Sequence, residues 1–370
     1  MKVLVTGGAG FIGLHMAKEL LNKGYEVRII DNLAEPVHRD GKALFIPKGA
    51  DFIKGDVRNK EDWIKALKDI EVVYHFSAYQ DYLTDFSKFF HVNTVGTALM
   101  YEVAVEKRIP LKKVIVASSQ AVYGEGKYLC SKDAIQYPNI RLNDQLAKGI
   151  WEVQCLICGM KMEPQWIDES KVNPKNQYAI SKYSQELAAL NLGRRYGIPT
   201  VCLRYSIVQG ARQSFYNSYS GVMRIFGLHL FFGKNPTIYE DGNQIRDYIN
   251  IQDVVNANLL VLEKDEIDYQ VYNVGGGKAY TVNEFYGLIA KMFGKNIDPK
   301  IPGEYRFGDT RHIFSDISKL RKLGWKPVIP IEQSIKEYMQ YLEEQVDIED
   351  ILEFQRKRMK DLNIVRKVIS

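Results

Sequence analysis

The 370-residue chain has only four cysteines and lacks any long hydrophobic run. Without an apolar stretch of 18 or more residues, we expect no membrane span. So few cysteines do not make a disulfide framework and fit a reducing compartment, so we expect a cytoplasmic protein. Met1-Lys2 runs straight into an apolar segment, which leaves no room for a signal peptide. The net charge of +5 is small and the basic residues are scattered, which argues against nucleic-acid binding.

Glycine, by contrast, is concentrated where the first apolar run ends. Val3–Gly13 carries Gly7, Gly10 and Gly13, and an amphipathic pattern follows over residues 14–23. Such a segment predicts a strand, a tight turn and a helix, with each glycine at a place where a side chain would obstruct the turn, the ligand or the packing of helix on strand. The unpaired N–H groups at the helix start would face an anion, so we predict a pyrophosphate site.

The next apolar strand ends in a carboxylate. Residues 25–31 read as a strand that finishes at Asp31, at about the 20-residue spacing from the glycines at which an acid meets an adenosine ribose. A carboxylate there would repel a 2′-phosphate, which favours NAD over NADP. The alternative is an ordinary strand–helix–strand unit with a surface aspartate.

Strand and helix patterns then alternate. Strands are expected over 51–57, 72–78, 113–119 and 200–205, with helices over 60–69, 85–106 and 177–195. Alternation of this kind predicts an α/β fold with a doubly wound parallel sheet of the Rossmann type. We expect an NAD-binding domain over 1–205, a smaller C-terminal α/β substrate domain over 206–345, interleaved with the first, and a charged tail with a solvated helix over 346–370.

Tyr178 and Lys182 lie four residues apart on the predicted helix 177–195. Positions i and i+4 share one helix face, so the phenol and the ammonium can converge. A free tyrosine has a pKa of about 10 and is a poor base at neutral pH. A neighbouring ammonium favours the phenolate, so the pair is suited to proton abstraction beside an oxidised nicotinamide. The alternative is an ordinary surface pair.

Several motifs together resemble a known family. They are the glycine loop with Phe11-Ile12, Asp56-Val57, Ser118-Ser119 followed by Val122-Tyr123-Gly124, Tyr178 with Lys182, and Arg246-Asp-Tyr-Ile249. In this order they resemble the extended short-chain dehydrogenase/reductase family over roughly residues 1–345. More narrowly, they are similar to NAD-dependent nucleotide-sugar epimerases of the UDP-glucose 4-epimerase type.

The resemblance implies a role for each matching residue. Ser119 would hydrogen-bond the reacting sugar hydroxyl, Tyr178 would be the catalytic base, and Lys182 would tune it and hold the nicotinamide ribose. The implied cofactor-binding set is Gly7, Gly10, Phe11, Ile12, Asp31, Asn32, Asp56, Val57, Phe76, Ser77, Ala78, Asn93, Tyr178, Lys182 and Tyr205. Arg246 and Arg306 would bind the substrate diphosphate. In relatives, helices matching 85–106 and 177–195 pair between subunits, which implies a homodimer.

Residues Gln120-Ala121 bear on the type of reaction. Dehydratases of this family have an Asp-Glu pair there, because loss of water needs an extra acid and base. The resemblance therefore implies epimerisation of a nucleotide-diphosphate sugar, at C4, through a transient keto intermediate. Another sugar-nucleotide oxidoreductase or dehydratase, or a non-catalytic NAD-binding redox sensor, stays open.

Two segments depart from the family pattern. Ser206-Ile207 replaces the usual Phe-Asn, and in the following loop Arg212, Phe215 and Asn217 are candidates for sugar-nucleotide contacts, with loop packing as the alternative. An insertion at about 127–170 carries Cys130, Cys155 and Cys158. Paired thiols before a glycine resemble half of a zinc knuckle, and Asp133 is the available fourth ligand. A metal-free flap over the active-site mouth is the other interpretation.

Overall fold

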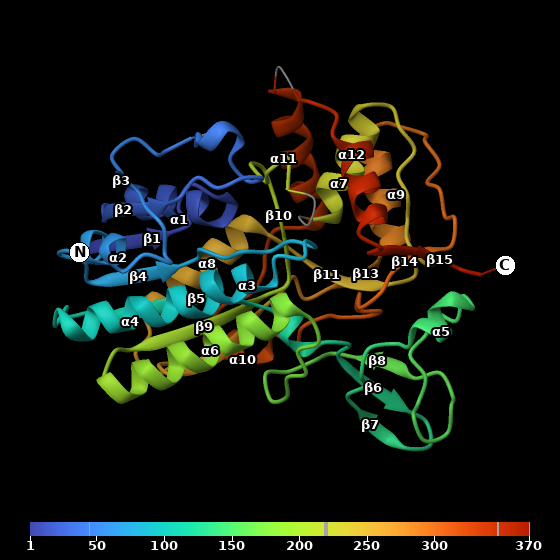
Figure 1. The fold of residues 1–370 in the computed structure, drawn as a ribbon, viewed down its shortest axis with the longest axis horizontal. Coiled ribbons are helices and arrows are strands. Elements are labelled where there is room, and N and C mark those ends of the chain that lie inside the picture. Colours follow the sequence, from blue (N-terminus) through green and yellow to red (C-terminus); the bar gives the residue numbers. More distant parts are fainter. Residues whose placement is uncertain (44, 218–220, 346–347, 370) are drawn as a thin grey trace.

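A parallel sheet of seven strands dominates the computed structural model (Figure 1), which describes residues 1–43, 45–217, 221–345 and 348–369. Across the sheet the strands are β12 (Gln270–Val274), β9 (Thr200–Tyr205), β5 (Lys113–Ser119), β4 (Val72–His75), β1 (Lys2–Thr6), β2 (Glu26–Asp31) and β3 (Asp51–Lys54). All neighbouring pairs are parallel. The strand order reverses between β1 and β4, where doubly wound sheets bind ligands. The predicted Rossmann-type sheet is confirmed.

Helices cover both faces because alternate strand residues point to opposite sides. Val3 and Val5 pack with α1 (Phe11–Asn22) and α8 (Ile251–Leu262), whereas Leu4 packs with the opposite cluster. That second cluster draws on α2 (Lys60–Ala66), α4 (Gly96–Glu106) and α6 (Gln177–Tyr196). The short helix α10 (Ser318–Arg321) contributes Leu320 to the first cluster. The strands are therefore buried on both faces, as parallel sheets require.

The helix expected over 85–106 is divided into three pieces. It begins as α3 (Phe86–Phe89), passes through a π-helical turn, η2 (Phe90–Val95), and continues as α4. The wider turn contains Asn93, which is fully buried. Within the described residues, we find no helix with both the length and the apolar character needed to cross a membrane.

A smaller unit is packed beside the sheet. It contains the sheet of β10 (Ile207–Gln209), β11 (Ile245–Asn250) and β13 (Ala279–Thr281), covered by α7 (Val222–Phe231), α9 (Val282–Met292) and α11 (Ile331–Glu343). Its core joins Phe226, Phe285 and Tyr338 from these three helices. The chain leaves this unit to form β12 and then returns to it.

The C-terminal segment packs on the smaller unit more closely than expected for a solvated helix. Helix α12 (Leu352–Asp361) buries Leu352 and Gln355, and β15 (Val365–Lys367) pairs antiparallel with β14 (Glu304–Arg306). Leu352 joins the core of the smaller unit, and Gln355 Nε2 donates to the carbonyl oxygen of Tyr216 (3.0 Å). The expected tail begins at residues 346–347 and ends at residue 370, and these three lie outside the described part.

The cysteine-bearing insertion forms a small module that stands away from the main sheet (Figure 1). Its three-stranded sheet has β6 (Lys127–Cys130) between β7 (Ala134–Gln136) and β8 (Glu163–Gln165), and α5 (Asn143–Ala147) lies in the chain between β7 and β8. Two single-turn helices, η1 (Arg39–Gly41) and η3 (Gln120–Tyr123), complete the described elements.

Candidate functional site

The glycine loop after β1 forms a cradle that side chains would fill. Gly7 has φ +63°, and a Cβ added there would lie 2.9 Å from the backbone nitrogen of Ser77. A Cβ at Gly13 would lie 2.3 Å from the carbonyl oxygen of Gly7. Helix α1 begins after Gly10, which supplies no side-chain cap. Its first N–H groups are thus arranged for an anion such as a pyrophosphate.

Two carboxylates follow at the ends of β2 and β3. Asp31 is buried, and its oxygens accept hydrogen bonds from the backbone N–H groups of Ala9 (3.1 Å) and Leu33 (2.9 Å). Asp56 accepts hydrogen bonds from Asn32 (2.9 Å) and Arg58. Burial raises the pKa of Asp56, but the hydrogen bonds from Arg58 and Asn32 outweigh it and lower the pKa to about 2. Asp56 is therefore anionic at neutral pH, and the two carboxylates suit ribose and adenine rather than a further phosphate.

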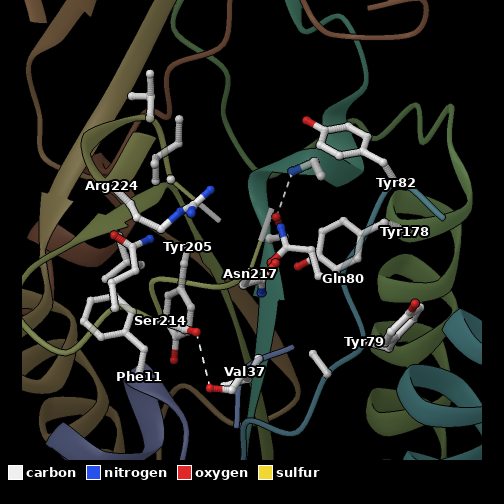
Figure 2. A pocket seen from close by; sticks show the side chains of 18 of the residues that line it. Phe11, Val37, Tyr79, Gln80, Tyr82, Tyr178, Tyr205, Ser214, Asn217 and Arg224 are labelled. Carbon is white, nitrogen blue, oxygen red and sulfur yellow. Dashed lines mark hydrogen bonds between the residues drawn. The ribbon is translucent and has the colours of Figure 1, made fainter. Parts of the chain in front are cut away.

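A single cavity of about 730 Å³ connects this cradle with the smaller unit. Most residues expected at the site line it: Gly7, Gly10, Phe11, Ile12, Asp31, Asn32, Asp56, Val57, Phe76, Ser77, Ala78, Ser119, Tyr178, Lys182, Tyr205, Asn217, Arg246 and Arg306. Figure 2 shows Tyr178, Asn217 and Arg224 directed into this pocket. From the insertion 127–170, Ile140 lines the cavity, so the module contributes to its wall.

Three expected residues lie elsewhere. Asn93 is buried behind the wall, where its amide pairs with the backbone of Tyr79 and donates to Ser181 Oγ (2.9 Å). Arg212 lies over the ring of Phe45, 4.9 Å from its centroid. Phe215 is stacked on Tyr341 in the core of the smaller unit. Asn93 therefore holds the residues of the cavity wall in position. For Arg212 and Phe215, the structure agrees with the alternative of loop packing.

Helix α6 holds Tyr178 and Lys182 within the wall. Asn176 caps the helix by accepting a hydrogen bond from Ala179 N (2.8 Å), which fixes the first turn that carries Tyr178. The side chains are 8% and 2% exposed for Tyr178 and Lys182, respectively. Lys182 Nζ donates to Gln185 Oε1 at 2.5 Å. Burial lowers the pKa of Lys182 to about 8, although Glu186 acts in the opposite direction.

A buried chain of hydrogen bonds runs from Lys182 to the glycine loop. Gln185 Nε2 donates to Thr97 Oγ1 (2.8 Å), and Thr97 Oγ1 in turn donates to the carbonyl oxygen of Asn93. The same Thr97 oxygen lies 2.8 Å from His75 Nε2. On the other side of the ring, His75 Nδ1 lies 2.8 Å from Thr6 Oγ1. Burial lowers the pKa of His75 to about 3, so the ring is neutral. Thr6 Oγ1 accepts two backbone N–H groups, so its proton goes to His75 Nδ1 and the ring proton sits on Nε2.

Ser119 lies where β5 meets η3. Its Oγ accepts a hydrogen bond from Ala121 N (3.1 Å), so the hydroxyl proton is available for another partner. The neighbouring Ser118 points to the opposite side and donates to Glu186. Ser119 thus lines the cavity, whereas the hydroxyl of Ser118 is turned toward Glu186 of α6.

The arginines expected at the diphosphate are held in different ways. Arg306 pairs with Asp309 through Nε (2.7 Å), and its guanidinium lies 4.7 Å from the ring centroid of Tyr82 and 5.0 Å from that of Tyr239. Arg246 donates to the carbonyl oxygens of Ile245, Thr310 and Arg311. Both guanidiniums are therefore oriented rigidly at the cavity wall.

Arg224 and His38 are among the lining residues that the sequence analysis did not predict. Arg224 of α7 is fully buried, lines the cavity and donates to the carbonyl oxygen of Phe215 (2.6 Å). A lone arginine in an otherwise apolar helix was the available signal. His38 lies 3.6 Å from Asp31 Oδ1 beside the predicted ribose position. It belongs to a loop with no periodic pattern, so no signal pointed to it.

The chain resembles characterised families over most of its length. A family model described as the NAD dependent epimerase/dehydratase family matches residues 3–143 and 157–275. A dTDP-L-rhamnose 4-epimerase of Burkholderia thailandensis is 32% identical over 355 residues, covering 94% of this chain and 96% of that protein.

Solved structures also resemble this chain over most of its length. A UDP-glucose 4-epimerase from Thermotoga maritima, solved with UDP-glucose, has a TM-score of 0.77 at 29% identity and covers 93% of this chain and 99% of its own. A UDP-glucose 4-epimerase from Thermus thermophilus, in complex with NAD, has a TM-score of 0.75 at 29% identity, covering 94% of this chain and 100% of its own.

Proposed function

The chain belongs to the NAD dependent epimerase/dehydratase family, and we propose that it is a nucleotide-sugar 4-epimerase that uses NAD. The observation that carries this proposal is the shared cavity. A glycine cradle with two carboxylates opens into the same space as Tyr178, Lys182 and Arg306. A dinucleotide on one side and a sugar diphosphate on the other would meet at the tyrosine.

The residues present suit NAD. The pyrophosphate would lie at Gly7, Gly10 and the start of α1, where an added Cβ would obstruct it. The adenosine ribose would lie at Asp31 and the adenine near Asp56 and Val57, all of which line the cavity. When bound, NAD would supply the chemistry of accepting a hydride from the sugar and returning it.

The remaining chemistry is assigned to side chains of this chain. Tyr178, as the phenolate, takes the proton from the C4 hydroxyl and later gives it back, while Ser119 hydrogen-bonds the same oxygen. Lys182 stabilises the phenolate by its charge, four residues along the same helix. The walls exclude water and leave the 4-keto sugar space to present its other face. No net oxidation of the sugar results.

The substrate diphosphate would be bound from the smaller unit. Arg306 and Arg246 are oriented at the wall, and Arg224 adds a third guanidinium from α7. Planar guanidiniums match phosphate oxygens in pairs, which favours this assignment over a single-point contact. Asn217 supports the sugar or the diphosphate from the same side.

A dehydratase is disfavoured by the groups next to Ser119. Gln120 and Ala121 line the cavity without a carboxylate. Glu125 also lines it, but its oxygens accept hydrogen bonds from Arg141 Nε (3.2 Å) and from Arg311 N (2.8 Å). This carboxylate is therefore committed to an internal ion pair and is a poor acid or base for loss of water.

The proposed assembly is a homodimer in the cytoplasm. Helices α4 and α6 pack side by side, and apolar side chains on or next to them are exposed: Val95 (43%), Ile180 (41%) and Leu187 (46%). A second copy would cover this surface. The free thiols support a reducing compartment, where nucleotide sugars and NAD are both found.

A panel of UDP-, dTDP- and GDP-sugars tests the function. Purified protein should convert one of them to its C4 epimer without net formation of NADH, and Tyr178→Phe should abolish conversion while the protein retains NAD. Stoichiometric NADH would instead show a dehydrogenase. Bound NAD with no conversion of any sugar would favour a redox sensor.

A further inference from the structure

Four potential metal ligands converge in the insertion. Cys130 ends β6, Asp133 lies in the turn to β7, and Cys155 and Cys158 occupy the loop before β8. The three sulfur atoms and one carboxylate oxygen all lie within 4.8 Å of one another. Cys130 and Cys155 each place Sγ 3.2 Å from Asp133 Oδ2, and Cys130 Sγ lies 3.5 Å from Cys158 Sγ.

We propose that these residues bind a structural zinc ion through three thiolates and a carboxylate. A tetrahedral zinc ion with Zn–S of about 2.3 Å and Zn–O of about 2.1 Å requires sulfurs about 3.7 Å apart and sulfur to oxygen about 3.6 Å. The three separations given above are a few tenths of an ångström shorter and the others are at most 4.8 Å, so small movements of the ligands accommodate the ion. Thiolates combined with a carboxylate favour zinc over Cu(I), which binds soft ligands alone.

The surrounding backbone supports thiolates. Ile157 N lies 3.4 Å from Cys155 Sγ, and Gln136 Nε2 donates to the same sulfur at 3.1 Å. Gly159, with φ +71°, turns the chain directly after Cys158, and its N–H donates to the carbonyl oxygen of Cys155 (2.9 Å). Donors aimed at a sulfur stabilise its anionic form and orient it toward a metal.

The folding of the loop favours the same conclusion. Cys155 is 3% exposed, whereas the apolar Leu156 and Ile157 beside it are 80% and 76% exposed. Burial of apolar side chains therefore does not explain why the loop adopts this conformation. The core of the module contains Tyr128, Cys130, Val153, Cys155 and Met162, so two of its five residues are ligands. Such small cores commonly need a metal or a disulfide for stability. A disulfide would leave the converging carboxylate unexplained.

The site has a consequence for the cavity. The module carries Arg141, which binds Glu240 at 2.9 Å, and Glu152, which binds Arg311 at 2.7 Å. Both partners belong to the smaller unit, and Glu240 lines the cavity. Zinc would hold the module rigid and thereby hold one wall of the substrate side in place. This consequence rests on the proposed function, whereas zinc binding does not.

Metal content of the full chain, purified with a non-thiol reductant and without chelator, tests the proposal. We expect one zinc ion per chain, and replacement by Co²⁺ should give the intense visible bands of a tetrahedral thiolate site. Asp133→Ala should weaken zinc binding by more than the roughly tenfold that loss of an outer-shell contact costs. Asp133→Cys should retain zinc. Cys202→Ala is the matched control, since Cys202 lies in the main sheet and should leave zinc content unchanged.

Folded protein that retains NAD but contains no zinc above trace, and gives no Co²⁺ bands, would overturn the proposal. Equal zinc content in wild type and Cys158→Ala would also overturn it. With a substrate in hand, metal removal should raise KM without loss of bound NAD. Loss of zinc without a change in KM would overturn only the proposed effect of the module on the cavity wall.

Discussion

Substitution of Gln185 tests how the chain tunes its tyrosine. Gln185 Oε1 accepts a hydrogen bond from the buried Lys182 ammonium at 2.5 Å, and Gln185 Nε2 donates to the neutral hydroxyl of Thr97. A hydrogen bond to a charged group contributes about 1.5–3 kcal/mol. Since one pKa unit is about 1.4 kcal/mol, Gln185→Leu should lower the pKa of Lys182 by roughly one to two units. From about 8, this brings it close to neutrality.

The expected effect on turnover follows from the charge. An ammonium that is partly deprotonated at pH 7 stabilises the Tyr178 phenolate less, so the acid limb of the kcat profile should move to higher pH by about one unit. At any pH on that limb this lowers kcat about tenfold, because each pKa unit there is a factor of ten. Gln185→Glu is the matched variant. Its carboxylate keeps Lys182 charged at pH 7, so the limb should move less than in Gln185→Leu.

The assay is kcat against pH from 5.5 to 9 for the three proteins, with bound NAD measured in each. Superimposable profiles would refute the role of Gln185. Equal shifts in the two variants would show a general disturbance of the core rather than a change in the charge of Lys182.

Three further predictions concern the cofactor side. Gly13→Ala forces a Cβ to within 2.3 Å of Gly7 O, so retained NAD should fall at least tenfold and unfolding stability by about 1–3 kcal/mol, measured by absorbance of extracted cofactor and by urea titration. Asp31→Ala should lower the preference for NAD over NADP in direct titration of cofactor-free protein; an unchanged ratio would contradict the assignment. Asp56 has a pKa of about 2 when folded and about 3.9 when unfolded, so its stabilising contribution is present above pH 4 and is lost as the pH falls toward 2. Asp56→Asn should therefore remove about 1 kcal/mol at pH 7, because solvent screens the partly exposed Arg58–Asp56 pair, and should flatten the acid dependence of stability, with an unaltered pH slope as the contrary result.

The parts of the fold predicted from sequence are those encoded locally. The turn after β1 needs Gly7 and Gly13 for reasons of space, and α6 ends at a glycine with φ +67° as its pattern predicts. The repeat of strands and helices was sufficient for the parallel sheet. The π-helical turn in 85–106 was not predictable, because its apolar periodicity resembles that of a continuous helix.

The remainder depends on contacts between distant segments. Arg141 and Glu240 are 99 residues apart and form a buried pair that neither local sequence indicates. Asn93 matches a cofactor-lining position, but its amide nitrogen donates hydrogen bonds to Tyr79 and Ser181 instead. Arg224 was not predicted as a site residue, because a mostly apolar helix is normally interpreted as part of the core. Secondary-structure propensity and the spacing of residues do not predict contacts between such distant segments.

The central claim is that hydrogen is removed from C4 of a nucleotide sugar and returned to the same carbon within one closed site. The most direct measurement uses substrate carrying deuterium at C4, incubated in ordinary water until the two epimers are at equilibrium, with mass and NMR analysis of the product. We expect a product that keeps its deuterium at C4, with no label in water and no net NADH. Loss of deuterium to solvent from C4, or inversion at another carbon, would contradict it.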